Sequence, residues 1–572
     1  MTPHAWSVPH ETNEHVAGLA DALRARGNDV VVLAPSSRSA ELLDGRRALQ
    51  AGTLDGVVAL SRAVPVSPRS AVAIPVGVRA NVATALRQGD FDVVHGFDPG
   101  LPGLSYVAML DAETTTVATF VDPERLGYPP RRNQRDRLLA RIDRLVATSD
   151  DTAARANIRF PGSYVVVPPG VDLERFSPDA KEKLVVIETS AGARPVVRAA
   201  LRALRDLPEW EAILLRPARL AARPSIPLGL RDRVHLRTAV RSEARAEIVR
   251  RAAIVVPSPD GLARLRSEAA AAACALVAPP GVVAQPELAT AALLRFAEDE
   301  AARERDGAER RASVADEGFD TLAERVEEIY AEARRRRRPT RRHDVEPLAD
   351  RDWIVADLHM HTSHSHDCSI EPDALVAHAE SEGLGAIAVT DHNVFTGALE
   401  AVEAARGRDV IVIPGEEVKT DRDGEVIGLF LHEEIPRGMS FEDTIAAIRE
   451  QEGVVYIPHP FDRMHSIPKP ATLHHHLPEI DVLEVYNARL LFDAYNDEAL
   501  RFARKHGLLM GAGSDAHVLQ GVGTGALRMR RFDGPEEFLL ALRTATVLRR
   551  PKSLAYLQSL KWVAQVRERV TG

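Results

Sequence analysis

The sequence has 572 residues, of which 45% are hydrophobic and 27% are charged. This composition is typical of a soluble protein and leaves room for about three domains. The net charge of -9 is mild, which argues against a dedicated nucleic-acid-binding protein. Two cysteines, Cys274 and Cys368, cannot form a disulfide framework, so we expect a reduced, cytoplasmic setting.

We expect no membrane attachment. Residues 1–10 lack the apolar core of a signal peptide. The nearest approach to a membrane span, residues 269–284, is interrupted by Pro-Pro-Gly at 279–281. This interruption predicts a buried helix followed by a strand.

The first 330 residues alternate between helix and strand patterns. An apolar helix pattern runs from Glu14 to Arg26 and is followed by a strand at Val30–Ala34. We predict two doubly wound, Rossmann-like domains, at residues 1–168 and 169–333. Their further strands are expected at Val93–His95, Val117–Phe120, Leu145–Thr148, Tyr164–Val167, Leu184–Ile187, Ala212–Leu215, Val234–Leu236, Ile254–Val256 and Ala275–Ala278.

An arginine-rich segment, residues 334–351, separates these domains from a third one at 352–553. Its five consecutive arginines could contact nucleic acid or an acidic surface, but a basic helix end that runs into a solvated linker is the simpler interpretation. Residues 554–572 form an amphipathic pattern that includes Trp562. We expect a C-terminal helix there that packs on a neighbouring domain or on another subunit of a homo-oligomer.

The third domain contains fourteen of the twenty histidines. His359 and His361 follow a short strand pattern at Trp353–Val355. Side chains two residues apart on a strand point to the same side, so the two rings face one point. Two neutral imidazoles in this arrangement suit a divalent cation such as zinc, manganese or iron.

Five more polar clusters each follow an apolar run, and helix patterns at Pro372–Glu382, Phe441–Gln451 and Asp493–Lys505 lie between several of them. Strands that alternate with helices predict a parallel sheet, and polar residues at the strand ends are typical of a (β/α) barrel mouth. A tract of three histidines, His474 to His476, predicts a loop. The five clusters are Thr390-Asp391-His392, Pro414-Gly415-Glu416-Glu417, Pro458-His459-Pro460, Tyr486-Asn487-Ala488-Arg489 and Ser514-Asp515-Ala516-His517.

In this order, Asp-Leu-His-Met-His, Val-Thr-Asp-His-Asn, Pro-Gly-Glu-Glu, Ile-Pro-His-Pro and Ser-Asp-Ala-His resemble the motifs of the PHP (polymerase and histidinol phosphatase) superfamily over residues 350–550. The resemblance implies a distorted seven-stranded (β/α) barrel with two or three divalent metal ions (Mn, Zn or Fe) that hydrolyses phosphate esters. It implies that the first metal is held by His359, His361, Glu417 and Asp515, the second by Glu417 and His459, and the third by Asp367, His392 and His517.

Two positions leave alternatives open. Glu425 stands where many relatives of this superfamily carry a histidine, and a carboxylate ligand there would favour manganese or magnesium. Either Glu416 or Glu417 could bridge two metals, and the spacing after Pro414 favours Glu417.

The expected reaction is attack of a metal-bridging hydroxide on the phosphorus of a small phosphorylated substrate. Arg489 and Arg463 would neutralise phosphate charge, although a salt-bridging role is the alternative for both. His517 or Asp391 would assist the leaving group.

Residues Pro168 to Phe176 resemble the interdomain link of GT-B glycosyltransferases of family four, and this resemblance spans residues 1–335. It implies that a glycine pair, a histidine and an arginine–lysine pair should bind the donor. The sequence has His10 and Glu11, Val121 and a segment from Glu188 to Arg194 at these places, while Asp260 and Glu268 match the paired acidic motif. An acid beside the diphosphate would repel it. We therefore expect an inactive module that serves as a scaffold, a dimerisation surface or a ligand binder.

The resemblance also places Met1 at the end of the expected first strand. Either that strand is absent or the reading frame begins further upstream.

Two alternative functions stay open for the whole chain. One is a glycosyltransferase that uses a nucleotide sugar, with the barrel as an accessory domain, and the other is a non-catalytic scaffold that binds phosphate ligands.

Overall fold

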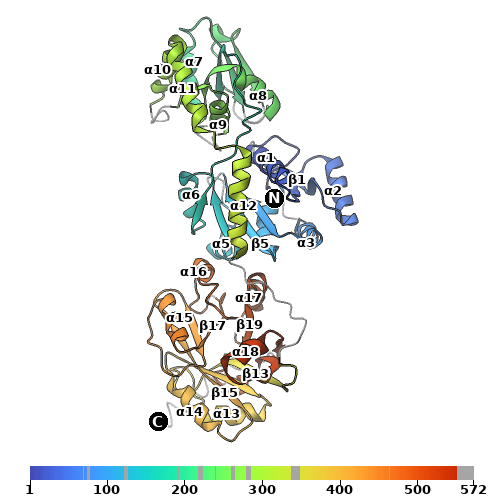
Figure 1. Cartoon of the computed structure of the whole chain (residues 1–572), viewed down its shortest axis with the longest axis vertical. Helices are drawn as coiled ribbons and strands as arrows, with labels where there is room; N and C mark the ends of the chain where they lie inside the picture. Colours follow the sequence, from blue (N-terminus) through green and yellow to red (C-terminus); the bar gives the residue numbers. More distant parts are fainter. Residues whose placement is uncertain are drawn as a thin grey trace. The chain divides into compact units, whose positions relative to one another are not determined.

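The computed structural model describes residues 1–67, 70–73, 78–121, 127–189, 192–216, 223–238, 240–258, 264–278, 285–335, 348–462 and 464–550. The chain forms two compact units, Met1–Arg334 and Arg335–Gly572 (Figure 1). Most of the expected linker, the Pro-Pro-Gly break at 279–281 and the expected helix at 554–572 lie outside the described residues. Among the residues that are described, no helix is both long enough and apolar enough to cross a membrane.

The first half of unit 1 contains two sheets, with strand orders β1-β2-β3 and β4-β5-β6-β7. Only β3 runs antiparallel to its neighbour. The strands are β1 (Val32–Ser36), β2 (Val57–Ser67), β3 (Ser70–Ala73), β4 (Val93–Phe97), β5 (Thr115–Phe120), β6 (Arg144–Ala147) and β7 (Tyr164–Val166). The helices are α1 (Glu11–Ala25), α2 (Ser39–Ala51), α3 (Val78–Gly89), α4 (Leu104–Asp111), α5 (Arg132–Leu139) and α6 (Asp150–Asn157).

The second half of unit 1 is a five-stranded parallel sheet in the order β10-β9-β8-β11-β12. Apolar side chains cover both of its faces, as parallel sheets require. Its strands are β8 (Glu182–Glu188), β9 (Glu211–Arg216), β10 (Val234–Thr238), β11 (Ala252–Val256) and β12 (Ala275–Leu276). Its helices are α7 (Arg194–Ala203), η2 (Leu228–Leu230), α8 (Ser242–Arg251), α9 (Arg264–Ala271), α10 (Glu287–Glu298) and α11 (Glu300–Ser313).

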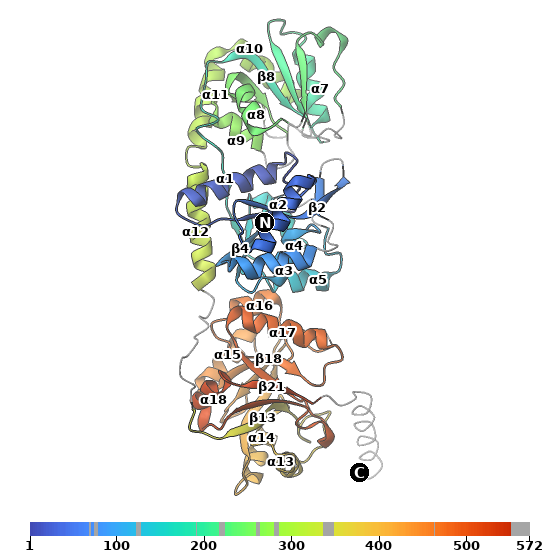
Figure 2. The same ribbon diagram turned by 90° about the vertical axis from the view of Figure 1, so that its right-hand side faces the viewer.

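The last helix of unit 1, α12 (Phe319–Arg335), returns to the first half. Leu322, Val326 and Ile329 on its apolar face pack in one cluster with Leu19 of α1. Figure 2 shows α12 running beside α1. Because these residues recur every three or four positions, they line one side of the helix. Helix α12 is therefore part of the first half's core, although it follows the second half in sequence.

Unit 2 contains a nine-stranded sheet in the order β19-β18-β17-β16-β15-β14-β13-β20-β21. The sheet closes on itself, because the Asp515 amide donates to the His359 carbonyl at 2.8 Å and the His361 amide donates to that of Ala516 at 3.2 Å. The seven strands from β13 to β19 thus form the expected distorted barrel. The strands are β13 (Trp353–Met360), β14 (Ala386–His392), β15 (Ile411–Lys419), β16 (Glu425–Leu429), β17 (Val454–Ile457), β18 (Val482–Asn487), β19 (Leu509–Gly513), β20 (Gly525–Arg530) and β21 (Thr546–Arg549).

Local signals fix the helices around this barrel. The Ser440 side chain accepts from the Asp443 amide and starts α15, and Gly507, with φ of 62°, ends α17. The expected loop at the histidine tract is wrong, because Pro470 opens a short helix there. The helices are α13 (Pro372–Ser381), α14 (Thr396–Ala404), α15 (Phe441–Glu450), α16 (Pro470–His475), α17 (Asp493–His506), η3 (Leu519–Gly521) and α18 (Gly534–Leu542).

Candidate metal centre

The predicted metal ligands converge at one end of the barrel. His359 lies near the end of β13 and His361 just beyond it, while Asp515 follows β19, which packs against β13. His361 Nε2 lies 3.3 Å from His359 Nε2 and 3.4 Å from Asp515 Oδ1. All three side chains are buried. They form a first group whose ligand atoms can reach one cation.

Glu417 on β15 connects this group to a second one. Its Oε2 lies 3.4 Å from His359 Nε2, and its Oε1 lies 3.0 Å from His459 Nε2. Glu425 Oε2 lies 3.8 Å from the same nitrogen of His459. A carboxylate that faces two groups of imidazoles is suited to bridge two cations.

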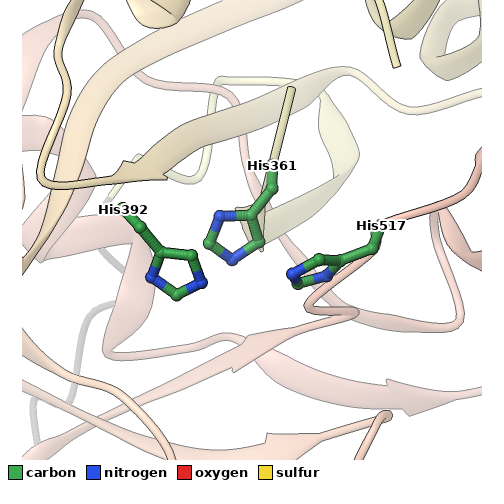
Figure 3. A group of neighbouring side chains, drawn as sticks. All are labelled: His361, His392 and His517. Atoms are coloured by element: carbon green, nitrogen blue, oxygen red, sulfur yellow. The ribbon is translucent and has the colours of Figure 1, made fainter. Parts of the chain in front are cut away.

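A third group contains His361, His392 and His517, and Figure 3 shows the three rings side by side. The ring centroid of His361 lies 4.4 Å from that of His392 and 4.4 Å from that of His517. Asp367 borders this group, with Oδ2 at 3.0 Å from His517 Nε2 and Oδ1 at 3.9 Å from His392 Nε2. The structure thus brings together the residues of all three predicted sets.

Hydrogen bonds fix which nitrogen of each ring faces the centre. His359 Nδ1 donates to Glu484 at 3.1 Å, and His517 Nδ1 donates to the carbonyl of Asp515 at 2.9 Å. His361 Nδ1 lies 3.2 Å from Ser365 Oγ, whose proton goes to Asp391 at 2.7 Å. In a neutral imidazole whose Nδ1 carries the proton, the Nε2 atom keeps its lone pair for a ligand.

Sequence reasoning missed Glu484. It lies in the middle of β18, buried, and accepts four hydrogen bonds. The available signal is a charged residue inside the apolar run Val482 to Val485, since an isolated buried charge is costly unless it is paired. Its donors are the side chains of His359, Tyr456 and Asn487 and the main chain of His459.

The charges at the centre are strongly coupled. Burial opposes the charged form of His392, but Glu417 outweighs it and raises the pKa of His392 to about 9. Burial likewise opposes ionisation of Glu417, yet His359 and His392 hold the pKa of this carboxyl well below its usual range. Burial and the nearby His517 keep the pKa of His361 well below its usual value. The site thus stabilises carboxylates and one neutral imidazole, which are ligand forms for a metal.

The donor set fits divalent cations. The Nε2 atoms of His359 and His361 lie 3.3 Å apart, and Asp515 Oδ1 lies 3.4 Å from the second of them, so two imidazole nitrogens and a carboxylate oxygen are within reach of one cation. Glu425 Oε2 is buried and has no hydrogen-bond partner among the described residues. Buried polar atoms without a partner are rare in folded proteins, so this oxygen is suited to a metal.

The other predicted catalytic residues differ in their surroundings. Arg489 Nη1 donates to Asp515 at 3.0 Å at the border of the site. Asp391 is buried, and its oxygens accept from Thr362 and Ser365, so its contacts orient the loop that follows His361. Glu416 turns away from Glu417 and accepts from the Ile435 amide at 2.9 Å. Arg463 lies outside the described residues.

In unit 1, charged side chains fill the region expected to hold a sugar donor. Glu268 on α9 is 1% exposed, and its oxygens accept from Arg245 and Arg264 at 2.7 Å. Glu14 on α1 contacts the same two arginines at 2.7 and 2.9 Å. Burial, with Glu11 nearby, raises the pKa of Glu188 to about 8.

The remaining expected donor-site residues are dispersed. The His10 ring accepts from the Thr12 amide and caps α1, Val121 is part of an apolar cluster, and Arg194 begins α7. Asp260 lies outside the described residues.

Comparison with known families gives three matches. A model of Glycosyltransferase Family 4 matches residues 12–175. The PHP domain matches residues 357–502, and a PHP-associated segment matches 493–547. The two PHP matches together cover the strands and loops that carry every predicted metal ligand.

Individual proteins are similar to parts of the chain. An uncharacterized protein of Methanocaldococcus jannaschii is 34% identical over 204 residues, which are 34% of this chain and 81% of that protein. A phosphatidyl-myo-inositol mannosyltransferase of Propionibacterium freudenreichii is 31% identical over 182 residues, 31% of this chain, but the match spans only 46% of that enzyme. A solved amidohydrolase from Chromobacterium violaceum has a TM-score of 0.27 at 18% identity, over 34% of this chain and 98% of its own. The chain therefore belongs to the PHP-domain family and carries a Glycosyltransferase Family 4 region ahead of that domain.

Proposed function

We propose that unit 2 is a metal-dependent phosphoesterase that hydrolyses a small phosphorylated substrate with two or three divalent cations (manganese, zinc or iron). The observation that carries this proposal is the sharing of ligands between the three groups. Glu417 faces both His359 and His459, and His361 belongs to two groups. Such sharing brings cations close enough to act on one phosphoryl group.

Bound cations would lower the pKa of a water molecule and neutralise the oxygens of the phosphate. His359, His361, Glu417 and Asp515 would hold the first cation. Glu417, His459 and Glu425 would hold the second, and Asp367, His392 and His517 the third.

Arg489 is suited to orient the substrate. The surrounding carboxylates of Asp515 and Asp367 outweigh its burial and raise the pKa of its guanidinium, so it stays charged. Its side chain is 22% exposed, which leaves part of the planar group open to solvent. We propose that it donates to a phosphate oxygen through this open side.

The contacts of His517 and Asp391 favour supporting roles. The Asp515 carbonyl holds Nδ1 of His517, so that Nε2 faces Asp367 of the same predicted ligand set at 3.0 Å. Asp391 is enclosed by Thr362 and Ser365. We therefore propose that His517 acts as a ligand and that Asp391 positions His361 through Ser365.

Phosphatase assays test this function. The full-length protein with added manganese should turn over p-nitrophenyl phosphate or a member of a panel of phosphomonoesters and diesters, and Asp515→Ala should abolish that turnover. Arg528→Ala, on the barrel wall against Trp353, serves as the control that keeps activity. Absence of turnover with every ester, from protein shown to contain metal, would refute the proposal.

We further propose that unit 1 performs no glycosyl transfer and serves as a scaffold or ligand binder. The pairing of Glu268 with Arg245 and Arg264 supports this, because both of its oxygens are already used. Incubation with nucleotide sugars should give no sugar transfer, whether or not calorimetric titration detects binding. Binding together with sugar transfer would instead support the alternative in which the barrel is the accessory domain.

A further inference from the structure

The ring of His459 is fixed differently from the other buried ligand rings. His359, His361 and His517 each have a hydrogen-bond partner at Nδ1. His459 Nδ1 is buried and has no hydrogen-bond partner among the residues that the structure describes. A ligand imidazole is usually oriented through the nitrogen that does not face the metal. The plane of the His459 ring therefore depends on another contact.

This contact is a stack with the ring of His465, which lies in the loop after β17. The two ring centroids lie 4.5 Å apart, and the ring planes differ by only 26°. A ring stacked in this way restricts the tilt of its partner. His459 Nε2 also lies 3.0 Å from Glu417 Oε1. The stack thus fixes the plane of the His459 ring, and Glu417 fixes which edge of it faces the predicted cations.

A buried carboxylate holds His465 in place. His465 Nδ1 donates to Asp462 Oδ2 at 2.7 Å, and Asp462 Oδ1 accepts from the Met464 amide at 3.1 Å. The Asp462 side chain is 3% exposed, whereas that of His465 is 28% exposed. A hydrogen bond to a carboxylate is stronger than one between neutral groups, so it keeps the His465 ring against His459 and out of the solvent.

The main chain of His459 depends on the same loop. Its φ of 27° is positive, a conformation that residues other than glycine rarely adopt and that persists only where neighbouring contacts enforce it. The Asp462 amide donates to the His459 carbonyl at 3.0 Å, and the His459 amide donates to Glu484 at 2.7 Å. Asp462 therefore acts on both the backbone and, through His465, the ring of His459.

The loop is itself anchored to the turn before β16. Lys469 Nζ donates to Asp423 Oδ1 at 2.7 Å. A side-chain carbon at Gly424 would lie 2.5 Å from the main-chain nitrogen of Pro468, so the two segments are in close contact. The next residue, Glu425, faces the same nitrogen of His459 as Glu417 does. The loop that carries His465 is thus fixed beside the second group of predicted ligands.

We propose that His465, oriented by Asp462, is a positioning residue that sets the plane of the His459 ring for the second cation. The inference rests on the proposed function, because it concerns one of the cations of that site. His465 acts only through His459, since among the described residues it belongs to none of the groups whose ligand atoms can reach one cation. Loss of the stack should weaken the binding of one cation and spare the cations whose ligand rings are fixed through Nδ1.

Manganese binding by the full-length protein tests the inference. His465→Ala removes the stack, whereas His465→Phe keeps a flat ring that cannot donate to Asp462. His475→Ala is the matched control, because it removes an exposed histidine of α16. Manganese bound per chain is measured by elemental analysis after dialysis at a series of free manganese concentrations. We expect His465→Ala to weaken one class of sites by about 10–100-fold, His465→Phe to restore a substantial part of that affinity, and the control to match the wild type.

Three outcomes would overturn the inference. Identical binding curves for the wild type and His465→Ala would show that His459 is oriented without the stack. Equal weakening in His465→Ala and His465→Phe would show that the stacked ring is not what matters. Equal weakening of every class of sites in His465→Ala would show a general disturbance of the centre. None of these readouts uses turnover, so a protein that binds manganese but hydrolyses no ester refutes the proposed function and leaves this inference intact.

Discussion

Glu484 lies beside the metal ligands and fixes two of them at once. Its oxygens accept from the ring of His359 and from the main chain of His459. A glutamine at this position keeps one acceptor oxygen but points an amide group at the other donors. We expect Glu484→Gln to weaken metal binding by about 10–100-fold, as measured by competition with a chromogenic chelator.

Glu479→Gln is the matched control for this change. Glu479 is half exposed and accepts from the His476 ring, away from the predicted ligands. Its substitution should leave metal affinity unchanged. Equal affinities for wild type and Glu484→Gln would mean that the ligands are held without this carboxylate.

Strand β16 explains how Glu425 reaches the metal centre. The strand runs antiparallel to both β15 and β17. Its first residue therefore lies at the end of the barrel where β15 and β17 have their last residues. Glu425 pairs with Lys419 at the end of β15. An otherwise parallel barrel thus obtains a ligand from the beginning of a strand.

Replacement of this carboxylate should change the choice of metal. Compared with a carboxylate, an imidazole ligand favours zinc over manganese. Glu425→His should therefore raise the ratio of zinc affinity to manganese affinity by on the order of tenfold. Competition between the two metals, read by elemental analysis after dialysis, measures the ratio. Glu434→His offers a control outside the predicted ligand set, and an unchanged ratio in Glu425→His would exclude residue 425 as a ligand.

Regular patterns made most elements of both units predictable from sequence. Apolar runs followed by polar clusters located six strands of the barrel that lead to predicted site residues, because a buried parallel strand leaves its polar residues at its end. The hairpin of β2 and β3 and the pair β20 and β21 were not predicted. Pro65 interrupts the apolar run of β2, and Arg528 and Arg530 interrupt that of β20, so these strands resemble loops until neighbours cover them. Glu484 was missed for a related reason: its role depends on residues distant in sequence, whereas ligands in short motifs reveal themselves locally.

At the scale of the whole molecule, two units with separate cores should respond separately to metal removal. A cation that binds only the folded barrel stabilises it by about 2.7 kcal/mol when the free cation concentration is a hundred times the dissociation constant. Chelation should therefore lower the unfolding temperature of unit 2 and leave that of unit 1 unchanged in differential scanning calorimetry. Asp515→Ala should remove the response, and a chelator effect on both transitions would contradict the assignment.

The stability of unit 1 should depend on pH through Glu188. Burial and Glu11 raise its pKa from 4.5 to about 8, so the folded state keeps a proton that the unfolded state loses. The contribution of this group is fully present below pH 4.5 and is lost as the pH rises through about 8, with a slope of at most about 1.4 kcal/mol per pH unit.

Glu188→Gln should remove this dependence, because the amide keeps an acceptor for the Ser258 amide without an ionisable group. The unfolding temperature of unit 1 at pH 6 and pH 8 measures the effect in both proteins. Between pH 6 and pH 8, the unfolding temperature of unit 1 should fall more in the wild type than in Glu188→Gln. Equal falls in the two proteins would show that the pKa of Glu188 is not raised.

The order of the ligands along the chain has a consequence for protein synthesis. His359 is made early in unit 2 and Asp515 late, yet the two meet through the closure of β13 against β19. At about 5–20 residues per second, the ribosome needs roughly 8–30 s to pass from one to the other. A nascent chain therefore cannot assemble the complete proposed metal centre before β19 and the loop after it have been made, so metal loading must await the last strands of the barrel.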